Sequence, residues 1–581
     1  MVAFVLSLSL LLGWSICAAL LVGSGSLLLG QLFHDYSPTL AFWIGLGIFV
    51  AVLETYHLFF ALGPFIALTL AILGVFGFAL NGHLLLCAFQ RCLFKRKWLL
   101  ACYAVVAVVL AIRASGRCEH YDTGLYGASA VRWATAYPTV PGLANLHGRF
   151  GYHSAVFLCT AALHQGLLSI LSYRLLEGLL ILVMFITVAE AAARLFRGVS
   201  GLTADWFLVL LLIPVIFWIG RAEIVGTNTD LPATIITLLA VSYLFAALGR
   251  SSELFPVERT CEQFFGAMSL FSLAVAIKIS VIALCGLGWI IAFIGLQRLA
   301  LPQRKKRQVA LAGVFLSACI LVPWLISGIL ISGYAFYPGS VLGLSVDWRV
   351  PPESLALVKL GVRSWARIPH GTLSETAGTL WFRSWFDAVS HNREGFLIPA
   401  VIVFLGAAVV LNHLARDKSQ VVLKQMLVLI PSIIGLVFWF SNAPALRFAE
   451  SAIWSTAAAL GALSLSMTTS KLKIAWIRTV ILVVLVVSAW CLYPRNLWRT
   501  SFEPPLKNTQ FAPLPNVETT TRQTLSGFEV RVPAEGNQCW EAPLPCTAYF
   551  NETLRQRRPG QLGAGFYSAV LPNNAEWLGE K

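Results

Sequence analysis

Residues 304–331 read RKKRQVALAGVFLSACILVPWLISGILI, and this single stretch carries the two signals that decide the fold. It begins with basic residues and continues as a mostly apolar run from Val309 to Ile331. A helix needs about 20 such residues to cross the hydrocarbon core of a bilayer, and Lys and Arg gather in loops that stay in the cytoplasm. The stretch therefore predicts a membrane-spanning helix that starts on the cytoplasmic side.

The composition of the whole chain indicates the same class of protein. Hydrophobic residues make up 58% of the 581 residues and charged residues only 12%, whereas about 25% of the residues in soluble domains are charged. A soluble protein of this size would need more polar surface, and a disordered chain would need far fewer Leu, Ile, Val and Phe residues. Both classes are excluded, and a polytopic membrane protein remains.

The apolar pattern of 309–331 recurs along the chain. Runs of this kind predict an all-α bundle of about 14 transmembrane helices. Their approximate ranges are 2–31, 38–61, 64–90, 98–113, 172–195, 203–220, 230–248, 263–278, 280–298, 309–331, 396–413, 421–440, 449–467 and 476–492.

The basic residues between these runs assign the two sides of the membrane. With 304–307 in the cytoplasm, alternation places 114–171, 332–395 and 493–581 outside it. Residues 151–171 are apolar enough to cross, but a crossing there would put the basic clusters on opposite sides. We therefore expect 151–171 to contain a helix that lies on the membrane surface or against the bundle.

The net charge of +15 also reflects the membrane topology. It arises from 42 Lys and Arg residues against 27 Asp and Glu residues, and its densest clusters lie in short gaps between apolar runs. Such clusters indicate membrane topology rather than nucleic-acid binding. We therefore expect membrane lipids, and no nucleic acid, among the partners.

Three parts are predicted along the chain: N-terminal transmembrane helices in 1–97, a transmembrane core in 98–492 and a C-terminal domain in 493–581. In the last part the apolar runs stop, Pro, Asn, Thr and Gln become frequent, and the alternation in GFEVRVP at 527–533 indicates a strand. We expect a small extracytoplasmic domain that is α+β or rich in β-structure.

Two cysteines of this C-terminal domain, Cys539 and Cys546, bracket the sequence CWEAPLPC. Two nearby thiols outside the cytoplasm are well placed to form a disulfide. The spacing alone leaves a pair of free thiols as the alternative.

The stretch that most suggests chemistry follows the fourth apolar run and reads CEHYDTGLYG at 118–127. Glu119 and Asp122 are three residues apart, so on a helical turn both carboxylates would face the same way. One could accept a proton from an attacking hydroxyl while the other orients that hydroxyl or binds a cation. The alternative is a helix cap and a solvated carboxylate beside the membrane.

The same loop is rich in groups that bind anions and polar ligands. A solvated loop needs no such density of basic, aromatic and glycine residues, whereas a site for a polar, partly anionic ligand does. The basic and imidazole side chains are those of His120, Arg132, His147, Arg149 and His153.

Three further ionisable residues lie near the ends of apolar runs on the same predicted side of the membrane, namely Asp230, Lys278 and Arg447. Ionisable groups near membrane depth are costly and therefore often functional. The alternatives are a helix N-cap for Asp230 and snorkelling side chains for Lys278 and Arg447.

Together these features resemble the GT-C superfamily of membrane glycosyltransferases, and more closely a bacterial family of uncharacterised GT-C-like membrane proteins. The similarity covers most of the chain. It is carried by YDTGLY at 121–126, GLANLHGR at 142–149, IKIS at 277–280, APALRF at 443–448 and CWEAPLPC at 539–546.

The resemblance implies an inverting glycosyltransferase of the bacterial inner membrane, with its active face and C-terminus outside the cytoplasm. It would transfer a sugar from a polyprenyl-phosphate donor to a cell-envelope glycan or lipid. Asp122 would match the acidic residue that deprotonates or orients the acceptor hydroxyl, with Glu119 as its helper. Arg447 and Lys278 would match the cations near the donor phosphate, where fixed positive charge stabilises the leaving group.

Arg149, His147, Arg132 and Asp230 complete the set of candidate substrate-binding residues. Many members of the superfamily carry adjacent acidic residues or an Asp-x-Asp motif in this loop, whereas here the spacing is Glu-x-x-Asp. This difference leaves the requirement for a divalent metal ion open.

Two other functions are compatible with the sequence. A polysaccharide polymerase or ligase also uses lipid-linked sugars, and the outer loop 332–395 contains arginines and histidines that suit it. A lipid or solute transporter would instead place polar residues near the membrane midplane, often in two repeated halves. No internal repeat is visible in this sequence.

Overall fold

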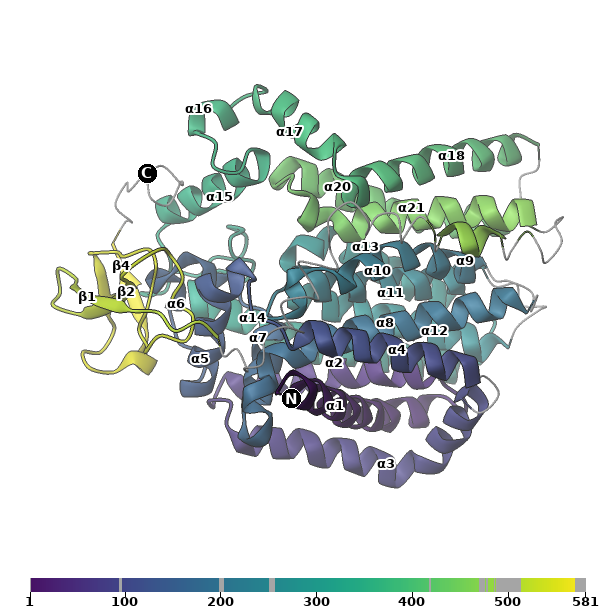
Figure 1. The fold of residues 1–581 in the computed structure, drawn as a ribbon, viewed down its shortest axis with the longest axis horizontal. Helices are drawn as coiled ribbons and strands as arrows, with labels where there is room; N and C mark the ends of the chain where they lie inside the picture. The colour runs from purple at the N-terminus through teal and green to yellow at the C-terminus, as the bar shows by residue number, and fades with distance from the viewer. Residues whose placement is uncertain are drawn as a thin grey trace.

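The computed structural model consists of a helical bundle with a small β-rich domain at one end (Figure 1). Among the residues that the structure describes, twelve helices are long and apolar enough to cross a membrane. The predicted all-α membrane bundle with a small C-terminal β-containing domain is thereby confirmed. The structure describes residues 2–93, 97–197, 203–249, 256–416, 420–469, 476, 479–484, 486 and 514–569.

The candidate spans agree with the apolar runs of the sequence. They are α1 (Val2–Leu32), α2 (Pro38–His57), α3 (Pro64–Leu93), α4 (Lys97–Ala114), α8 (Ser172–Phe196), α11 (Asp230–Gly249), α12 (Val257–Ile277), α13 (Ile282–Gln297), α14 (Gln303–Ser332), α18 (Ile398–Arg416), α19 (Gln420–Met426) with α20 (Leu429–Asn442), and α21 (Leu446–Thr469).

Two of the expected spans, 203–220 and 476–492, are not among these candidate spans. The run 203–220 forms two short helices, α9 (Thr203–Leu210) and α10 (Leu212–Ile219). Pro214 has no N–H to donate to the carbonyl four residues earlier, at Leu210, so a continuous helix loses a bond where the two helices separate. The run 476–492 falls mostly outside the described residues.

The centre of the bundle is formed by α11 and α12. In the most apolar 18-residue stretch of these two helices, 89% and 100% of the residues are buried inside the protein. At its periphery, α1 crosses α2 with backbone-to-backbone contact. A Cβ atom on Gly25 would lie 1.8 Å from the Ala41 carbonyl oxygen, and one on Gly45 would lie 1.8 Å from that of Leu21. Small residues allow such close packing of transmembrane helices.

The segment between α4 and α8 folds into short helices at one end of the bundle. They are η1 (Thr123–Gly127), α5 (Ala128–Ala136), α6 (Leu143–Leu146), η2 (Gly148–Gly151), α7 (Ala155–Leu163) and η3 (Gly166–Leu171). Helix α7 is almost fully buried and contacts α2, α5 and α8. It therefore packs against the bundle, one of the two arrangements expected for 151–171, and is too short to cross.

The outer loop 332–395 also contains helices, which the apolar pattern did not predict. They are α15 (Pro352–Arg367), α16 (Leu373–Thr376), α17 (Trp381–Ser390) and η6 (Arg393–Leu397). Helices α15 and α17 are short and amphipathic, with several exposed apolar side chains. Because they lack a long apolar run, the signal that identifies membrane spans does not detect them.

The C-terminal domain contains two antiparallel hairpins. Strand β1 (Thr519–Gln523) pairs with β2 (Glu529–Pro533), and β3 (Leu554–Gln556) pairs with β4 (Phe566–Ser568). The strand expected near 527–533 is therefore present as β2. The domain lies beside α5 and α6, and we call this end of the bundle the site end (Figure 1).

Candidate active site

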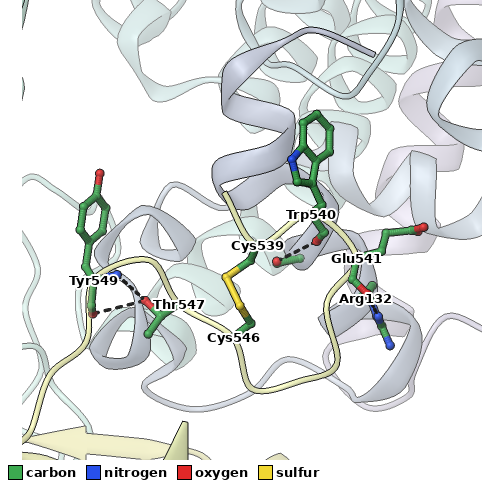
Figure 2. Close-up of a disulfide and its surroundings, with 8 residues drawn as sticks. Arg132, Cys539, Trp540, Glu541, Cys546, Thr547 and Tyr549 are labelled. Atoms are coloured by element: carbon green, nitrogen blue, oxygen red, sulfur yellow. Dashed lines mark hydrogen bonds between the residues drawn. A yellow bond between two sulfur atoms is a disulfide. The ribbon is translucent and has the colours of Figure 1, made fainter. Parts of the chain in front are cut away.

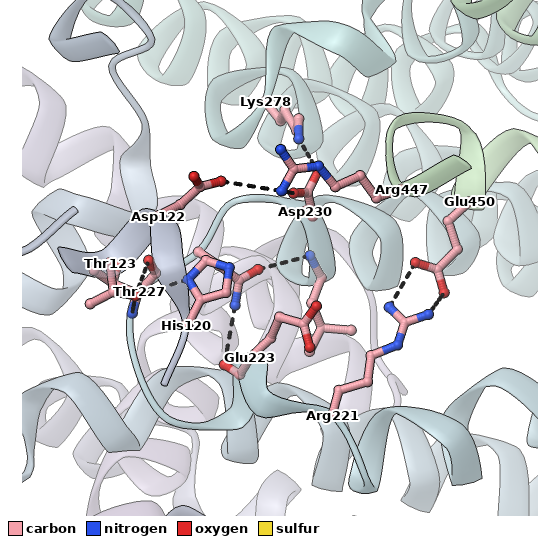
Figure 3. Close-up of polar contacts among 12 residues, drawn as sticks. His120, Asp122, Thr123, Arg221, Glu223, Thr227, Asp230, Lys278, Arg447 and Glu450 are labelled. Atoms are coloured by element: carbon pink, nitrogen blue, oxygen red, sulfur yellow. Dashed lines mark hydrogen bonds and ion pairs between the residues drawn. The ribbon is translucent and has the colours of Figure 1, made fainter. Parts of the chain in front are cut away.

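Four of the predicted site residues meet at the site end and form one charged cluster (Figure 3). Arg447 Nη1 lies 3.2 Å from Asp122 Oδ2 and 3.9 Å from Asp230 Oδ2. Lys278 Nζ contacts Asp230 Oδ1. We call Asp122, Asp230, Lys278 and Arg447 the Asp122 cluster.

Each residue of the Asp122 cluster lies where a helix begins or ends. Asp122 immediately precedes η1, Asp230 begins α11, Lys278 caps the end of α12, and Arg447 is in the first turn of α21. An acidic residue is favourable at a helix N-terminus and a basic residue at a C-terminus, which suits Asp230 and Lys278. Separate helix ends thus converge to place opposite charges together.

The cluster is largely shielded from solvent and lined by aromatic rings. The exposed fractions of the side chains of Asp122, Asp230 and Lys278 are 13%, 15% and 16%. Lys278 Nζ lies 4.4 Å from the centroid of the Phe448 ring. The Arg447 guanidinium lies 5.0 Å from the same ring and 4.7 Å from that of Trp365, on α15. Aromatic faces stabilise cations electrostatically and hold these two side chains in place.

The charge state of Asp122 follows from these neighbours. Burial alone would raise the pKa of its carboxyl, but Arg447, Arg149, His120 and Lys278 together hold the pKa below its usual value of 3.8. Asp122 is therefore ionised at neutral pH and can accept a hydrogen bond from a hydroxyl group.

Arg149 acts on Asp122 from the edge of the cluster. Its guanidinium lies 6.0 Å from the centroid of the Tyr126 ring. Burial alone would lower the pKa of Arg149, but the Asp122 carboxylate and nearby tyrosines raise it. Arg149 therefore remains positively charged beside Asp122.

His120 joins this site, although the sequence analysis gave it no role of its own. Its Nδ1 lies 2.9 Å from Thr123 Oγ1, and that hydroxyl donates to the Thr227 carbonyl oxygen at 3.1 Å. The hydroxyl proton is thereby engaged, so Nδ1–H donates to Thr123 and the lone pair is on Nε2. Burial, opposed by Asp122 and Glu223, lowers the pKa of His120, which leaves the ring neutral near pH 7.

His147 and Arg132 lie elsewhere, where the loop 114–171, our candidate catalytic loop, meets the C-terminal domain. The buried His147 ring stacks on Tyr549 at 5.1 Å, and its Nδ1 accepts the backbone N–H of Arg149. Arg132 donates to the backbone carbonyl of Glu541. Among the described residues neither side chain contacts the Asp122 cluster, so both help to attach the C-terminal domain.

Glu119 is also separate from the cluster. Its side chain is exposed and makes no hydrogen bond or ion pair with the residues that the structure describes. The expectation of a shared face assumed a helix from Glu119 onwards, but 117–120 are not helical and the helix begins at Tyr121. The spacing of three residues therefore does not align Glu119 with Asp122.

A disulfide between Cys539 and Cys546 closes a loop over this region (Figure 2). The loop contacts the segment that carries Asp122. Gln538 Nε2 donates to the Tyr121 carbonyl oxygen at 2.9 Å, and the Trp540 N–H donates to that of Gly124 at 2.9 Å. A Cβ atom on Gly124 would lie 2.5 Å from the Trp540 ring, so the two segments are packed tightly.

A second network of ion pairs involves Glu450, which lies close to Arg447 on α21. Arg221 forms a two-pronged pair with Glu450, with Nη1–Oε2 at 3.0 Å and Nη2–Oε1 at 2.9 Å, and also contacts Glu394. Trp218 Nε1 donates to the same Glu450 carboxylate at 2.8 Å. Because Glu450 lies one turn after Arg447, the network fixes the first turn of α21. The signal for this network in the sequence is an acidic residue, Glu450, within the apolar run 449–467.

The described residues around the Asp122 cluster do not form a ready site for a divalent metal ion. In the part of the chain that the structure describes, no three His, Cys, Asp or Glu side chains are grouped as metal ligands. The two carboxylates of the Asp122 cluster are already paired with Arg447 and Lys278. We therefore assign no step of the chemistry to a metal ion.

Fold and site together define a polytopic membrane protein with a shielded cluster of opposite charges at one end of its helical bundle. Residues 7–454 match the family described as a domain of unknown function, DUF8201, and the chain belongs to this family.

Comparison with other proteins gives one structural neighbour and no match among curated sequences. The neighbour is ArnT from Cupriavidus metallidurans, in a crystal structure bound to undecaprenyl phosphate. The two chains are 17% identical and align with a TM-score of 0.35 over 68% of this chain and 64% of ArnT. The chain thus matches less than two thirds of the length of ArnT.

Proposed function

We propose that this protein is an inverting membrane glycosyltransferase. It transfers a sugar from a polyprenyl-phosphate donor to a cell-envelope glycan or lipid outside the cytoplasm of a bacterium. The observation that carries the proposal is the ion pair between Asp122 and Arg447, with Lys278 and Asp230 beside it, in a shielded site. The motifs that resemble a bacterial family of GT-C-like membrane proteins include three of these four residues.

The chemistry requires a proton acceptor and a place for negative charge. The acceptor hydroxyl oxygen forms a bond to the anomeric carbon of the sugar while the bond from that carbon to the phosphate oxygen breaks. The hydroxyl proton passes to a base, and the bonding electrons leave with the polyprenyl phosphate. Fixed cations at the phosphate lower the barrier because its negative charge grows in the transition state.

The residues of the site divide these tasks. Asp122 is ionised and orients the acceptor hydroxyl or takes its proton. Arg447 and Lys278 bind the donor phosphate, and Arg447 has enough N–H groups to contact Asp122 and a phosphate together. Burial and the Arg447 charge lower the pKa of Lys278, so Arg447 and Arg149 supply the fixed positive charge beside Asp122. An anionic donor beside Lys278 favours its charged form.

His120 offers a second route for the proton. Its Nε2 carries the lone pair, and Asp122 and Glu223 are close enough to affect its charge. A neutral imidazole can accept a proton through such a lone pair. We therefore include His120 as the group that relays or accepts the proton once Asp122 has oriented the hydroxyl.

The two alternative functions receive no support from the contacts. The residues of the outer loop that suggested a polymerase or ligase are Arg363, Arg367, His370, Arg383 and His391. Two of them, Arg363 and Arg367, donate to the backbone carbonyls of Asn442, Ser441 and Thr376. The Asp122 cluster lies at helix ends, whereas a transporter site is expected near the midplane. Neither alternative is proposed.

The experiment that tests the proposal is mass spectrometry of lipids and envelope glycans from a strain that lacks the protein. The strain is complemented with wild type, with Asp122→Asn, or with Asp387→Asn as a matched control on an exposed carboxylate of α17. We expect a sugar to be lost from an envelope component and its polyprenyl-phosphate form to accumulate. Wild type and Asp387→Asn restore the sugar, while Asp122→Asn lowers the transfer rate by about 10²–10⁴.

Two results would contradict this proposal. Restoration of the wild-type glycan by a stably inserted Asp122→Asn variant would show that Asp122 is not needed. An unchanged glycan profile, with an altered distribution of a lipid or solute across the membrane, would make transport the better assignment.

A further inference from the structure

Helix α17 (Trp381–Ser390) presents aromatic side chains to its surroundings although it lies outside the candidate spans. Trp381, Trp385 and Val389 are buried against the protein. The next face carries Phe382 and Phe386, each 47% exposed, and Leu380, just before the helix, is 75% exposed. A contiguous exposed apolar surface of this kind indicates an interaction site.

The remaining face of α17 is polar. Arg383, Ser384 and Asp387 are exposed there, and the His391 side chain that follows is 78% exposed. The helix therefore has a face for the protein, a face for an apolar environment and a face for water. This division is typical of helices that lie in the plane of a membrane surface.

The contacts of α17 place it at the level where two candidate spans end. Trp385 Nε1 donates to the Pro444 carbonyl oxygen at 2.6 Å, and its ring lies 5.5 Å from that of Phe440, near the end of α20. The span that includes α18 starts at Arg393, three residues after Ser390. Three residues reach at most about 10 Å, so the C-terminal end of α17 remains close to the start of this span.

The exposed face of α17 also continues the surface that the spans present to lipid. Phe440 on α20, Leu397, and Val401 and Phe404 on α18 are 41%, 45%, 49% and 74% exposed. Phe382 lies 6.5 Å from Phe440, ring centroid to ring centroid. Figure 1 shows α17 next to the adjoining ends of α18 and α20. The apolar surface is therefore continuous from the spans onto α17.

We propose that α17 is an interfacial helix that docks into the lipid leaflet at the site end. Leu380, Phe382 and Phe386 are inserted among the upper acyl chains, while Arg383 and Asp387 face the headgroups and water. The occupant of this surface is lipid because the surface is an extension of the lipid-facing spans and its opposite face is charged. This inference does not depend on the proposed glycosyl transfer.

The test uses the photoreactive amino acid p-benzoylphenylalanine in the full-length protein, reconstituted in nanodiscs of phosphatidylethanolamine and phosphatidylglycerol. The probe replaces Phe382 or Phe386 in separate variants, and it replaces Asp387 as the control on the polar face of the same helix. The first two replacements enlarge an exposed phenyl ring and leave the buried tryptophans unchanged, so the fold is retained. After illumination, adducts are identified by mass spectrometry.

We expect lipid adducts at 382 and 386 in several-fold higher yield than at 387. Equal yields at 386 and 387, or no lipid adduct at either phenylalanine position, would overturn the proposal. A crosslink to a second copy of the chain, or to residues 487–513 of the same chain, would also overturn it by showing that protein covers this face. An inactive protein that still gives the expected adducts would reject glycosyl transfer and retain the membrane docking.

Discussion

Asp122 depends on residues that come from distant parts of the sequence. Its position before η1 is local, but its ionised state depends on Arg447 and Lys278, which are far away in the chain. Sequence analysis could select these residues because each is an ionisable group at the end of an apolar run. It could not establish the pairing, because pairing depends on how α12 and α21 pack. Glu119 shows the opposite case, in which spacing suggested a neighbour that the backbone separates from Asp122.

We expect Arg447→Ala to lower the rate of sugar transfer by about 10²–10³, since it removes a fixed cation from the developing phosphate charge. Arg447→Lys should retain part of the rate, because it keeps the charge but loses the planar set of donors. The measurement is transfer from a synthetic polyprenyl-phosphate sugar in proteoliposomes. Arg558→Ala, at an exposed arginine of the C-terminal domain, is the matched control. Equal rates for Arg447→Ala and this control would remove Arg447 from the mechanism.

We expect the stability of the folded protein to depend on pH through His147. Burial lowers the pKa of His147 from 6.5 to about 3, so between these values the unfolded chain binds a proton that the folded protein does not. Stability is therefore fully present above about pH 6.5 and falls as the pH is lowered towards 3. Thermal unfolding in nanodiscs should show a smaller loss between pH 7 and pH 5 for His147→Gln than for wild type. An identical pH dependence in both proteins would contradict the assignment.

At the scale of elements, long apolar runs predicted the spans well because the bilayer imposes a length and a composition on each of them. Shorter elements have no such constraint. The run 203–220 separates into α9 and α10 near Pro214, and α15 and α17 appear in a loop that the sequence had left without structure. The disulfide loop was visible as a cysteine pair, but its contact with Gly124 was not, because that contact joins opposite ends of the chain.

We expect the Cys539→Ser/Cys546→Ser double variant to lose both local stability and transfer activity. The closed loop is short, and its opening costs about 2–3 kcal/mol in the chain-entropy estimate. Activity falls because Gln538 and Trp540 hold the backbone on either side of Asp122. Unfolding temperature and transfer rate are measured together, with Cys102→Ser at an exposed thiol as the control. An unchanged transfer rate in the double variant would show that the loop does not position Asp122.

At the scale of the whole molecule, the two ends of the bundle differ in their charged residues. Helix α14 begins with the basic residues 304–307, and near its other end the Leu330 carbonyl oxygen accepts the N–H of Gly142 in the catalytic loop. The basic end and the site end therefore lie at opposite ends of one long helix. From the positive-inside rule we therefore propose that the site end lies outside the cytoplasm.

This orientation is tested with reporter fusions. We expect alkaline phosphatase fused after Lys581 to be active and green fluorescent protein at the same position to be dark. A fusion after Leu301, in the loop between α13 and α14, should give the reverse result and serves as the control. A fluorescent fusion at Lys581 would place the C-terminal domain in the cytoplasm and contradict an extracytoplasmic site.

The contact between the disulfide loop and the catalytic loop also has a consequence for biogenesis. Gln538 and Tyr121, which this contact joins, are 417 residues apart. At about 5–20 residues per second, a ribosome needs roughly 20–80 s to synthesise that interval. During this time Asp122 has already been made, but the segment that contacts its neighbours Tyr121 and Gly124 has not. Under the proposed function, the nascent protein is therefore expected to remain inactive until its last domain has been synthesised and its disulfide has formed.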